Sequence, residues 1–230
     1  MKAGWIGLAL WAALALSPGV TPASTVEERV AEFGAQARSR LAPYFRSTKL
    51  EYPPKQLVLV GLKAEQRLEV YAAGGDGRMR YLRSYPVLGA SGTIGPKLRS
   101  GDRQVPEGLY RISALNPDSL FHVSLRIDYP NAHDRRRAAA EGRSDLGGDI
   151  MIHGGSISIG CLAMGDRAVE ELFVLAADTG LGNLRVILSP LDLRRRSLDR
   201  LVRHSRPWTP ELYSEIRAAL AELPGIRVAR

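Results

Sequence analysis

Hydrophobic positions recur at helical spacing near the start of the chain and again near its end. Between residues 24 and 46 the apolar side chains lie three or four positions apart, which predicts an amphipathic helix that ends at Pro43. The same spacing returns over residues 209–223, where Thr209-Pro210 marks a helix start. We therefore expect a helical extension on each side of the central part of the chain.

The central part of the chain is dominated by short apolar or alternating stretches, which are typical of β-strands. Strands are expected at 56–62, 67–73, 79–87, 109–112, 120–127, 150–152 and 184–188. A helix is expected from Asp166 to about Asp178, with Gly180 as its stop signal, and a charged surface helix is expected from Asn131 to Gly142. This pattern predicts a mainly β domain with a few helices over residues 55–190. Residues 24–54 would form an N-terminal helix and linker, and residues 191–230 a basic helical extension.

The first residues resemble an export signal. Lys2 supplies a positive charge, residues 6–16 are almost entirely apolar, and small residues follow up to Ala23. An uncleaved membrane anchor is the alternative, but the run is about half of the roughly 20 residues that a spanning helix needs. We expect residues 1–23 to be a signal peptide cleaved near Ala23, and the protein to be exported to the periplasm.

The composition narrows the class of protein without selecting a partner. With 45% hydrophobic and 24% charged residues in 230, the chain can bury a sizeable core and is not wholly disordered. The formal net charge of +8 leaves nucleic acid, an anionic membrane surface and an anionic cell wall open. The basic residues in the segment 191–206 predict a solvated face, with contact to wall polymers or lipid head groups as the alternative.

A single cysteine, Cys161, follows a histidine by eight residues. A predicted strand ends at His153, and a loop rich in glycine and serine leads to Gly160 and Cys161. An imidazole within reach can take the thiol proton and leave an imidazolium–thiolate pair, and the Gly160 and Cys161 amides could face a developing oxyanion. A structural histidine beside a buried cysteine is the alternative reading, whereas a metal site is not expected because a second cysteine is absent.

These residues resemble a known family. His153-Gly154 followed by Ser158-Ile159-Gly160-Cys161 is similar to the signature of the L,D-transpeptidase catalytic (YkuD) domain. Lys97, Gly101-Asp102 and the run from Pro106 to Tyr110 extend the similarity, which covers residues 56–190. Cys161-Leu162-Ala163-Met164 and Tyr129-Pro130-Asn131 resemble the YafK-like subgroup of that family.

The resemblance implies a β-sandwich or barrel and a two-step acyl transfer without a cofactor. Cys161 would attack a carbonyl of a peptidoglycan stem peptide beside meso-diaminopimelate, and His153 would act as base and then as acid. Gly160 would offer its backbone amide to the oxyanion and Ser158 would support the site. The residues that would contact substrate are Gly154, Gly155, His122, Tyr129 and Asn131.

The resemblance leaves the acyl acceptor open. The acceptor would be an amine of another stem peptide, a lysine of a protein such as an outer-membrane lipoprotein, or water. A hydrolase that releases a wall-linked protein and a non-catalytic wall-binding module are the alternative functions. Ala163 stands where the common form of the family has arginine, which predicts a smaller and less charged pocket wall.

A glycine-rich stretch from Gly89 to Lys97 has the composition of a phosphate-binding loop. It lacks the Gly-Lys-Ser/Thr of that motif, so neither a nucleotide nor a nucleic acid is expected as partner. We expect the stretch to be a loop that approaches the active site.

Overall fold

Two five-stranded sheets form the centre of the protein. The computed structural model describes residues 23–197 and 205–225. The first sheet has the order β3 (Arg80–Pro86), β2 (Arg67–Ala73), β1 (Gln56–Leu62), β10 (Leu184–Ser189) and β5 (Gly108–Tyr110). The second has the order β4 (Gly89–Ala90), β9 (Leu162–Ala163), β8 (Met151–His153), β7 (His122–Ile127) and β6 (Ile112–Ser119). Each sheet keeps two edge strands within the described residues, so neither closes into a barrel.

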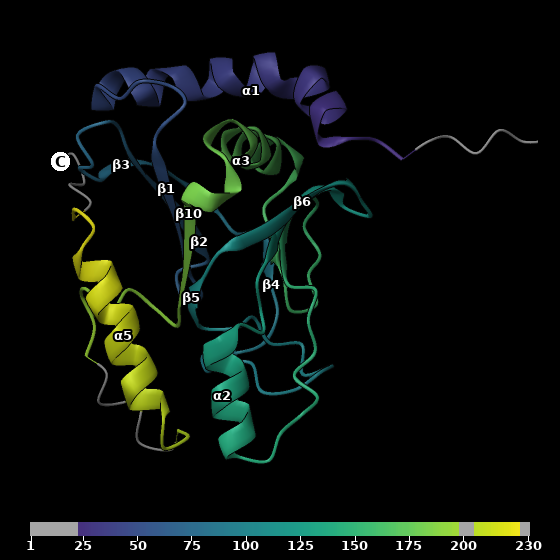
Figure 1. The fold of residues 1–230 in the computed structure, drawn as a ribbon, viewed down its shortest axis with the longest axis vertical. Helices are drawn as coiled ribbons and strands as arrows, with labels where there is room; N and C mark the ends of the chain where they lie inside the picture. Colours follow the sequence, from purple (N-terminus) through teal and green to yellow (C-terminus); the bar gives the residue numbers. More distant parts are fainter. Residues whose placement is uncertain (1–22, 198–204, 226–230) are drawn as a thin grey trace, which may run out of the picture.

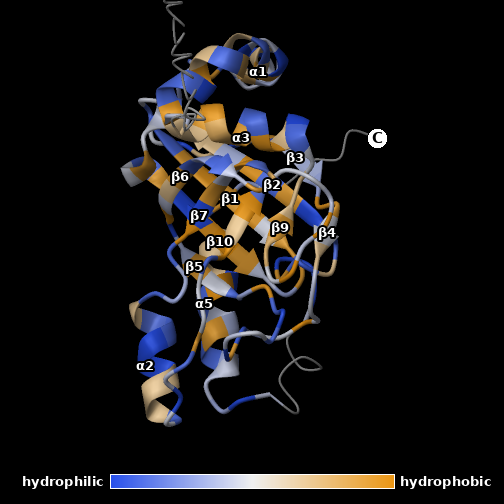
Figure 2. Cartoon of the chain, turned by 90° about the vertical axis from the view of Figure 1, so that its right-hand side faces the viewer, coloured by the Kyte–Doolittle hydropathy of each residue, from blue (hydrophilic) through white to orange (hydrophobic). Residues whose placement is uncertain are grey.

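The two sheets share one hydrophobic core with two helices. Side chains of β1, β2 and β10 meet those of β7, β8 and β9 there, and α3 (Asp166–Thr179) contributes its apolar face. The helix α1 (Val26–Thr48) lies across α3 (Figure 1) and buries Phe33, Leu41 and Phe45. Figure 2 shows that the strands carry most of the hydrophobic residues. The mainly β architecture with helical extensions is therefore confirmed, as a sandwich.

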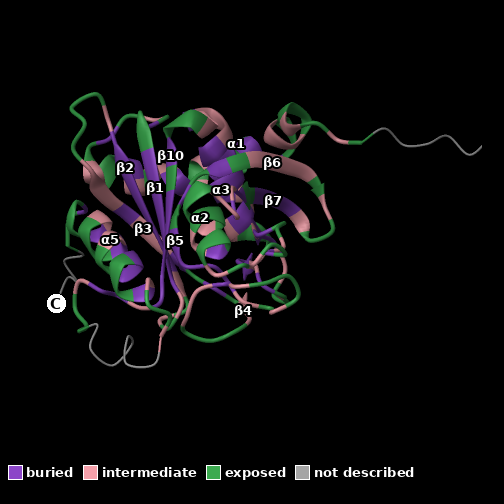
Figure 3. Ribbon diagram, turned by 60° about the horizontal axis from the view of Figure 1, so that its bottom comes forward, coloured by how far each residue is buried: buried purple, intermediate pink, exposed green. Residues whose placement is uncertain are grey.

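The opposite face of the first sheet is covered by the C-terminal helix α5 (Thr209–Ala221). Its residues Leu212, Ile216 and Leu220 pack against Val58 and Ile187. Figure 3 shows this helix with one buried and one exposed face. Because the first sheet is covered on both sides, β1 is buried at every position after Gln56, which explains its unbroken apolar run.

The N-terminal helix runs past the proline that was expected to end it. Thr25 and Glu28 form a capping box at the start, and the helix continues through Pro43 to Thr48. The expected end at Pro43 is wrong because Leu41 and Phe45, on either side of the proline, are fully buried or nearly so and hold the last turns in place. Tertiary packing outweighs the hydrogen bond that proline cannot donate.

Strand β6 is the longest of the strands that the sequence pattern missed, the others being the two-residue strands β4 and β9. The chain leaves β5 and enters β6 across Arg111, so one expected strand at 109–112 is the junction of two strands in different sheets. The rest of β6 lacks the sequence pattern of a strand, because it contains Pro117 and polar residues. The strand tolerates a proline because it lies at the sheet edge. The strand expected from Leu120 begins only at His122, since Leu120 and Phe121 form the turn between β6 and β7.

The remaining helices follow the sequence closely. The expected surface helix is α2 (Ala132–Ala140), which Figure 2 shows as largely hydrophilic, and a short 3-10 helix, η1 (Leu181–Asn183), follows α3. Within the basic segment, Arg194 is not solvated, because it pairs with the buried carboxylate of Glu69 and with Asp192. Most of the predicted signal peptide and residues 198–204 of the basic segment lie outside the described residues.

Candidate active site

Adjacent parallel strands bring the histidine and the cysteine to one cavity. His153 ends β8, Cys161 immediately precedes β9, and the two strands pair with His153 opposite Ala163. Because the strands are parallel, the loop between them leads the chain back to the end of the sheet at which β8 begins. Both side chains line a cavity of about 370 Å³, so the pairing expected from the spacing is possible in this fold.

The environment of His153 favours a neutral base. Its Nδ1 lies 2.6 Å from the carbonyl oxygen of Gly154, an arrangement in which Nδ1 carries the proton and donates it. Nε2 then keeps its lone pair. The ring is 3% exposed and stacks on Phe121 at 4.7 Å, and burial lowers the pKa of His153. The imidazole is therefore ready to accept a proton at neutral pH.

The environment of Cys161 favours a protonated thiol. Burial raises the pKa of Cys161 and the Asp149 carboxylate raises it further, while Lys97 opposes part of this effect. The sulfur lies 3.6 Å from the backbone oxygen of Asp149, to which the thiol can donate. Both shifts favour a neutral thiol and a neutral imidazole over the ion pair expected from sequence.

We predict that the alkylation rate of Cys161 by iodoacetamide rises with a midpoint above the ordinary thiol pKa of about 8.5. A raised pKa leaves less thiolate at neutral pH, so the rate at pH 7 should be lower than that of a free cysteine. Asp149→Asn should move the midpoint down, because a neutral amide no longer disfavours the thiolate.

Asp118→Asn is the matched control for this measurement. Asp118 lines the same cavity but is not among the groups that shift the Cys161 pKa, so the midpoint should stay in place. A midpoint well below 8.5 that His153→Ala abolishes would show a preformed imidazolium–thiolate pair instead.

The backbone amides of Gly160 and Cys161, beside the thiol, donate hydrogen bonds to serine hydroxyls. The Cys161 amide donates to Ser158 Oγ at 2.9 Å, and Ser158 Oγ donates back to the Cys161 carbonyl at 2.6 Å. The Gly160 amide donates to Ser91 Oγ at 2.6 Å. Ser158 thus fixes the backbone of the cysteine. An oxyanion role for Gly160 stays a prediction, and it requires the bond to Ser91 to be released.

Ser91 is a residue that the sequence did not single out. It follows β4, which pairs with β9, and its hydroxyl also donates to the backbone oxygen of Arg103. The Gly89–Lys97 stretch therefore contacts the loop between His153 and Cys161 through Ser91. Its sequence signal was the glycine-rich stretch itself, which pointed to the loop but not to the serine.

Gly154 and Gly155 shape the turn behind the histidine. The Gly154 amide donates to the backbone oxygen of Phe121, and the Gly155 amide donates to Asp166 Oδ1 at 2.8 Å. A Cβ on Gly154 would lie 2.6 Å from that Phe121 oxygen, so this position has no room for a side chain. Neither glycine is among the residues that line the cavity.

Three of the expected substrate contacts lie elsewhere. His122 faces Glu170, with 3.2 Å between Nε2 and Oε1, and its ring packs near Phe33 of α1. Tyr129 is buried and donates to a backbone oxygen, and Asn131 caps α2. The structure does not bring His122, Tyr129 or Asn131 to the cavity that holds Cys161.

The cavity mouth consists of residues that the sequence analysis did not select. The β6–β7 turn lies on one side and the loop between His153 and Cys161 on the other. The additional lining residues are Asn116, Asp118, Ser119, Leu120, Phe121, Asp149, Met151, Ile157 and Ile159. A signal was present in the sequence, since two isoleucines flank Ser158 in a loop that is otherwise glycine and serine.

Ala163 does not form a wall of this cavity. It is fully buried in β9, where its Cβ faces Gly89 of the neighbouring strand β4. The expected effect of an alanine in place of arginine on the pocket wall is therefore wrong, because the side chain points into the protein at this position.

Comparison with known families decides the assignment. The model of the L,D-transpeptidase catalytic domain (YkuD) matches residues 55–187, which is more than half of the chain. The chain belongs to this family. The match contains both His153 and Cys161.

Relatives of this L,D-transpeptidase-family chain agree with the assignment. The protein of Escherichia coli (strain K12) with the name "Putative L,D-transpeptidase YafK" is 35% identical over 137 residues, which cover 59% of this chain and 53% of YafK. YafK of Escherichia coli O157:H7 matches equally. This chain thus spans about half the length of the curated relatives that it matches.

Solved structures show the same fold. The helical cell shape determining protein Pgp2 from Campylobacter jejuni superimposes with a TM-score of 0.50 and 22% identity, over 64% of this chain and 51% of Pgp2. A variant of Pgp2 gives a TM-score of 0.50 and 18% identity, over 86% of this chain and 61% of that protein. At this identity the likeness supports the fold and nothing further.

Proposed function

We propose that the protein is a cysteine-dependent acyltransferase that acts on peptidoglycan stem peptides at meso-diaminopimelate. The observation that carries this proposal is the shared cavity of Cys161, which immediately precedes β9, and His153, which ends the adjacent parallel strand β8, in a domain of the L,D-transpeptidase family. The wall substrate comes from the family, and the choice of nucleophile and base comes from the geometry.

The neutral resting state defines the first step. As the sulfur of Cys161 attacks the carbonyl carbon, His153 Nε2 takes the thiol proton, so no thiolate need accumulate beforehand. The carbon–nitrogen bond of the amide then breaks, the leaving amine takes the proton from His153, and a thioester remains. An incoming amine or water attacks the thioester and gives a proton to His153. The carbon–sulfur bond then breaks, and His153 returns the proton to the sulfur, which restores the thiol. This sequence uses no cofactor.

The proposed place of action is the periplasm, because peptidoglycan lies there and because the first 23 residues read as an export signal. Across residues 23–197 and 205–225, none of the helices has the length and apolar character needed to cross a membrane.

Incubation of the purified protein with defined wall fragments, followed by mass spectrometry, tests the proposed function. Cross-linked dimers, exchanged terminal residues or hydrolysed stems would each identify an acyl transfer and its acceptor, and all should vanish in Cys161→Ala. Retention of fragments without any covalent product would favour the alternative, a wall-binding module on the same fold.

The cavity mouth favours a second candidate, a hydrolase that releases a protein from peptidoglycan. Seven large hydrophobic side chains are exposed in the described part of the chain, and four of them line this cavity. Leu120 is 98% exposed, Ile157 70% and Ile159 71%. Such a contiguous apolar rim is typical of a contact surface.

The charges around the cavity also favour a substrate that is linked to a protein. Its described lining includes the carboxylates of Asp118 and Asp149 but neither lysine nor arginine. A bare stem peptide ends in carboxylates, which this lining does not pair. A stem joined through an amide to a lysine of a protein, such as an outer-membrane lipoprotein, presents an aliphatic chain that can cover the rim.

We predict that Ile157→Ser slows turnover of a protein-linked muropeptide several-fold and changes turnover of a bare tetrapeptide muropeptide by less than about twofold. Loss of one exposed aliphatic contact removes about 1 kcal/mol from the complex with the apolar partner alone. Leu109→Ser, at an exposed leucine outside the cavity, is the control and should affect neither substrate. Equal losses on both substrates would contradict a protein-side role for the rim.

A further inference from the structure

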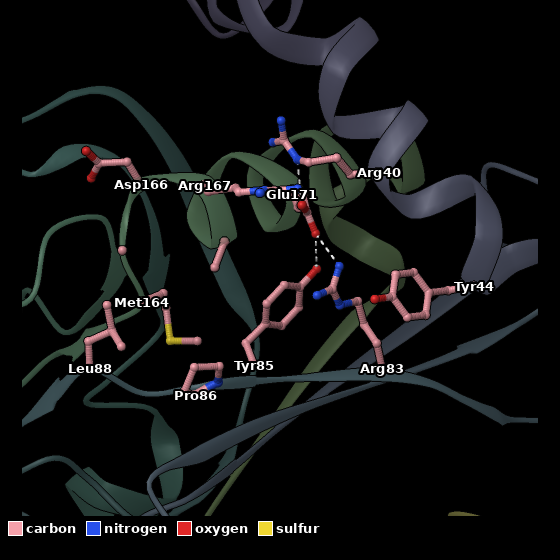
Figure 4. Close-up of a pocket in the computed structure, with 12 residues that line it drawn as sticks. Arg40, Tyr44, Arg83, Tyr85, Pro86, Leu88, Met164, Asp166, Arg167 and Glu171 are labelled. Atoms are coloured by element: carbon pink, nitrogen blue, oxygen red, sulfur yellow. Dashed lines mark hydrogen bonds and ion pairs between the residues drawn. The ribbon is translucent and has the colours of Figure 1, made fainter.

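A second cavity, of about 400 Å³, lies where three elements meet (Figure 4). The helix α1, the strand β3 and the start of α3 each contribute an arginine to its lining, namely Arg40, Arg83 and Arg167. Pro86, Leu88 and other apolar side chains form the remaining wall. This cavity shares no lining residue with the one that holds Cys161 and His153.

A buried carboxylate fixes two of the arginines. Glu171 is 3% exposed at its side chain, and its two oxygens accept from Arg40 Nε and from Arg83 Nη1, each at 2.6 Å. Tyr85 donates to the second oxygen at 2.7 Å, and the Arg83 guanidinium lies between the rings of Tyr44 and Tyr85. The two guanidinium groups are therefore held in place before any ligand arrives (Figure 4).

Donors remain after these bonds are made. Arg40 Nη1, Arg83 Nη2 and the whole guanidinium of Arg167 have no partner among the described residues. Two carboxylates also line the cavity, but Glu171 already accepts from three side chains, and Asp166 accepts from the Gly155 amide. Three arginines thus face two lining carboxylates, and Arg40 also pairs with Glu170 at 2.9 Å, so positive and negative charges are equal in number around the free donors.

The charge around the cavity, the free guanidinium donors and the apolar wall together favour a ligand with a single negative charge. A phosphate with two charges would meet Asp166 and Glu171 with too little compensation, whereas a carboxylate carries one charge and fits the planar fork of a guanidinium. The apolar wall at Pro86 and Leu88 can receive an aliphatic side chain next to that carboxylate. A volume of about 400 Å³ lies within the range of small-molecule sites.

We propose that this cavity binds the carboxylate end of a short peptide with an aliphatic residue beside it, as a site separate from the catalytic cavity. The proposal stands on the arginines and does not depend on the reaction at Cys161. The backbone joins the two sites, since the Met164 amide donates to the His153 carbonyl and the Gly165 amide to that of Gly155. A peptide bound here would therefore lie close to β8, the strand that ends at His153.

Isothermal titration calorimetry on the full-chain Cys161→Ala variant tests the proposal without turnover. The probes are acetyl-alanyl-leucine with a free carboxylate, the same dipeptide as C-terminal amide, and the stem tripeptide alanyl-glutamyl-diaminopimelate. We expect the acid to bind at least about tenfold more tightly than the amide, and more weakly at high salt. The tripeptide arm distinguishes a wall peptide from the end of a protein chain as the natural source.

Charge changes at two exposed leucines locate the ligand. Leu88, 53% exposed, lines the arginine cavity, and Leu120, 98% exposed, lines the catalytic cavity. Leu88→Asp should weaken binding of the acid about tenfold by repulsion, Leu88→Lys should strengthen it, and Leu120→Asp should leave it unchanged. Arg167→Gln should weaken it several-fold, and thermal melting confirms that each variant folds.

Three results would overturn the proposal. Equal affinity for acid and amide would remove the carboxylate from the interaction. Sensitivity to Leu120→Asp with indifference to both changes at Leu88 would place the peptide in the catalytic cavity. Failure of every probe to bind at millimolar concentration would leave the arginines with a purely structural role in holding α1.

Discussion

Cys161→Ala is expected to abolish every acyl-transfer product, with a loss of at least about 1,000-fold in turnover. The thiol is the nucleophile of the proposed reaction, and the remaining groups of the cavity cannot form a thioester without it. Cys161→Ser should be nearly as inactive, because a hydroxyl beside a neutral imidazole is a far poorer nucleophile than a thiol. Product formation from defined muropeptides, followed by mass spectrometry, measures both losses.

Ser156→Ala provides the control for this prediction. Ser156 lies in the same loop, is exposed, and is not among the residues that line the cavity. Its turnover should stay within about twofold of the original protein, and the melting temperature of Cys161→Ala should be nearly unchanged. Full activity in Cys161→Ala would remove the cysteine from the mechanism, whereas loss of activity together with loss of folding would assign it a structural role.

Glu171→Ala is expected to destabilise the protein by about 3–5 kcal/mol, because it leaves the partly buried Arg83 without its carboxylate and removes one of the two carboxylates that bind Arg40. The carboxylate connects Arg40 of α1 and Arg83 of β3 to α3, and Tyr85 loses its partner as well. For a chain of this size the melting temperature should fall by roughly 10 °C. Thermal unfolding followed by circular dichroism measures the shift.

Asp76→Ala is the matched control for the loss of an ion pair. Asp76 binds Arg80 at 2.6 Å on the protein surface, where water screens the pair, so its removal should change the stability little. If Glu171→Ala and Asp76→Ala shift the melting temperature equally, the buried network does not hold α1 to the domain.

The sequence predicted the site where local order is directly readable. A strand end, a short loop and a second strand bring His153 and Cys161 to one cavity, and these features lie within residues 151–163. The sequence did not show that Asn131 caps a helix and that Tyr129 donates to a backbone oxygen, since such a residue looks the same in sequence as one that binds substrate.

Long-range packing explains the other differences. Nothing near Pro43 in the sequence shows that Leu41 and Phe45 will be buried and keep the helix intact. The Ser91 hydroxyl reaches Gly160 across 69 residues, and the apolar rim joins the β6–β7 turn to a loop far along the chain. Contacts of this kind arise only when the two sheets assemble.

The neutral resting thiol has a consequence for chemical durability. Peroxides and disulfides react with the thiolate form of cysteine, so a cysteine with a raised pKa is oxidised slowly. The chain has one cysteine, so no internal partner could protect it by disulfide formation. The direction of this shift predicts slow oxidation of Cys161 between encounters with substrate, because burial and the Asp149 carboxylate both disfavour the thiolate.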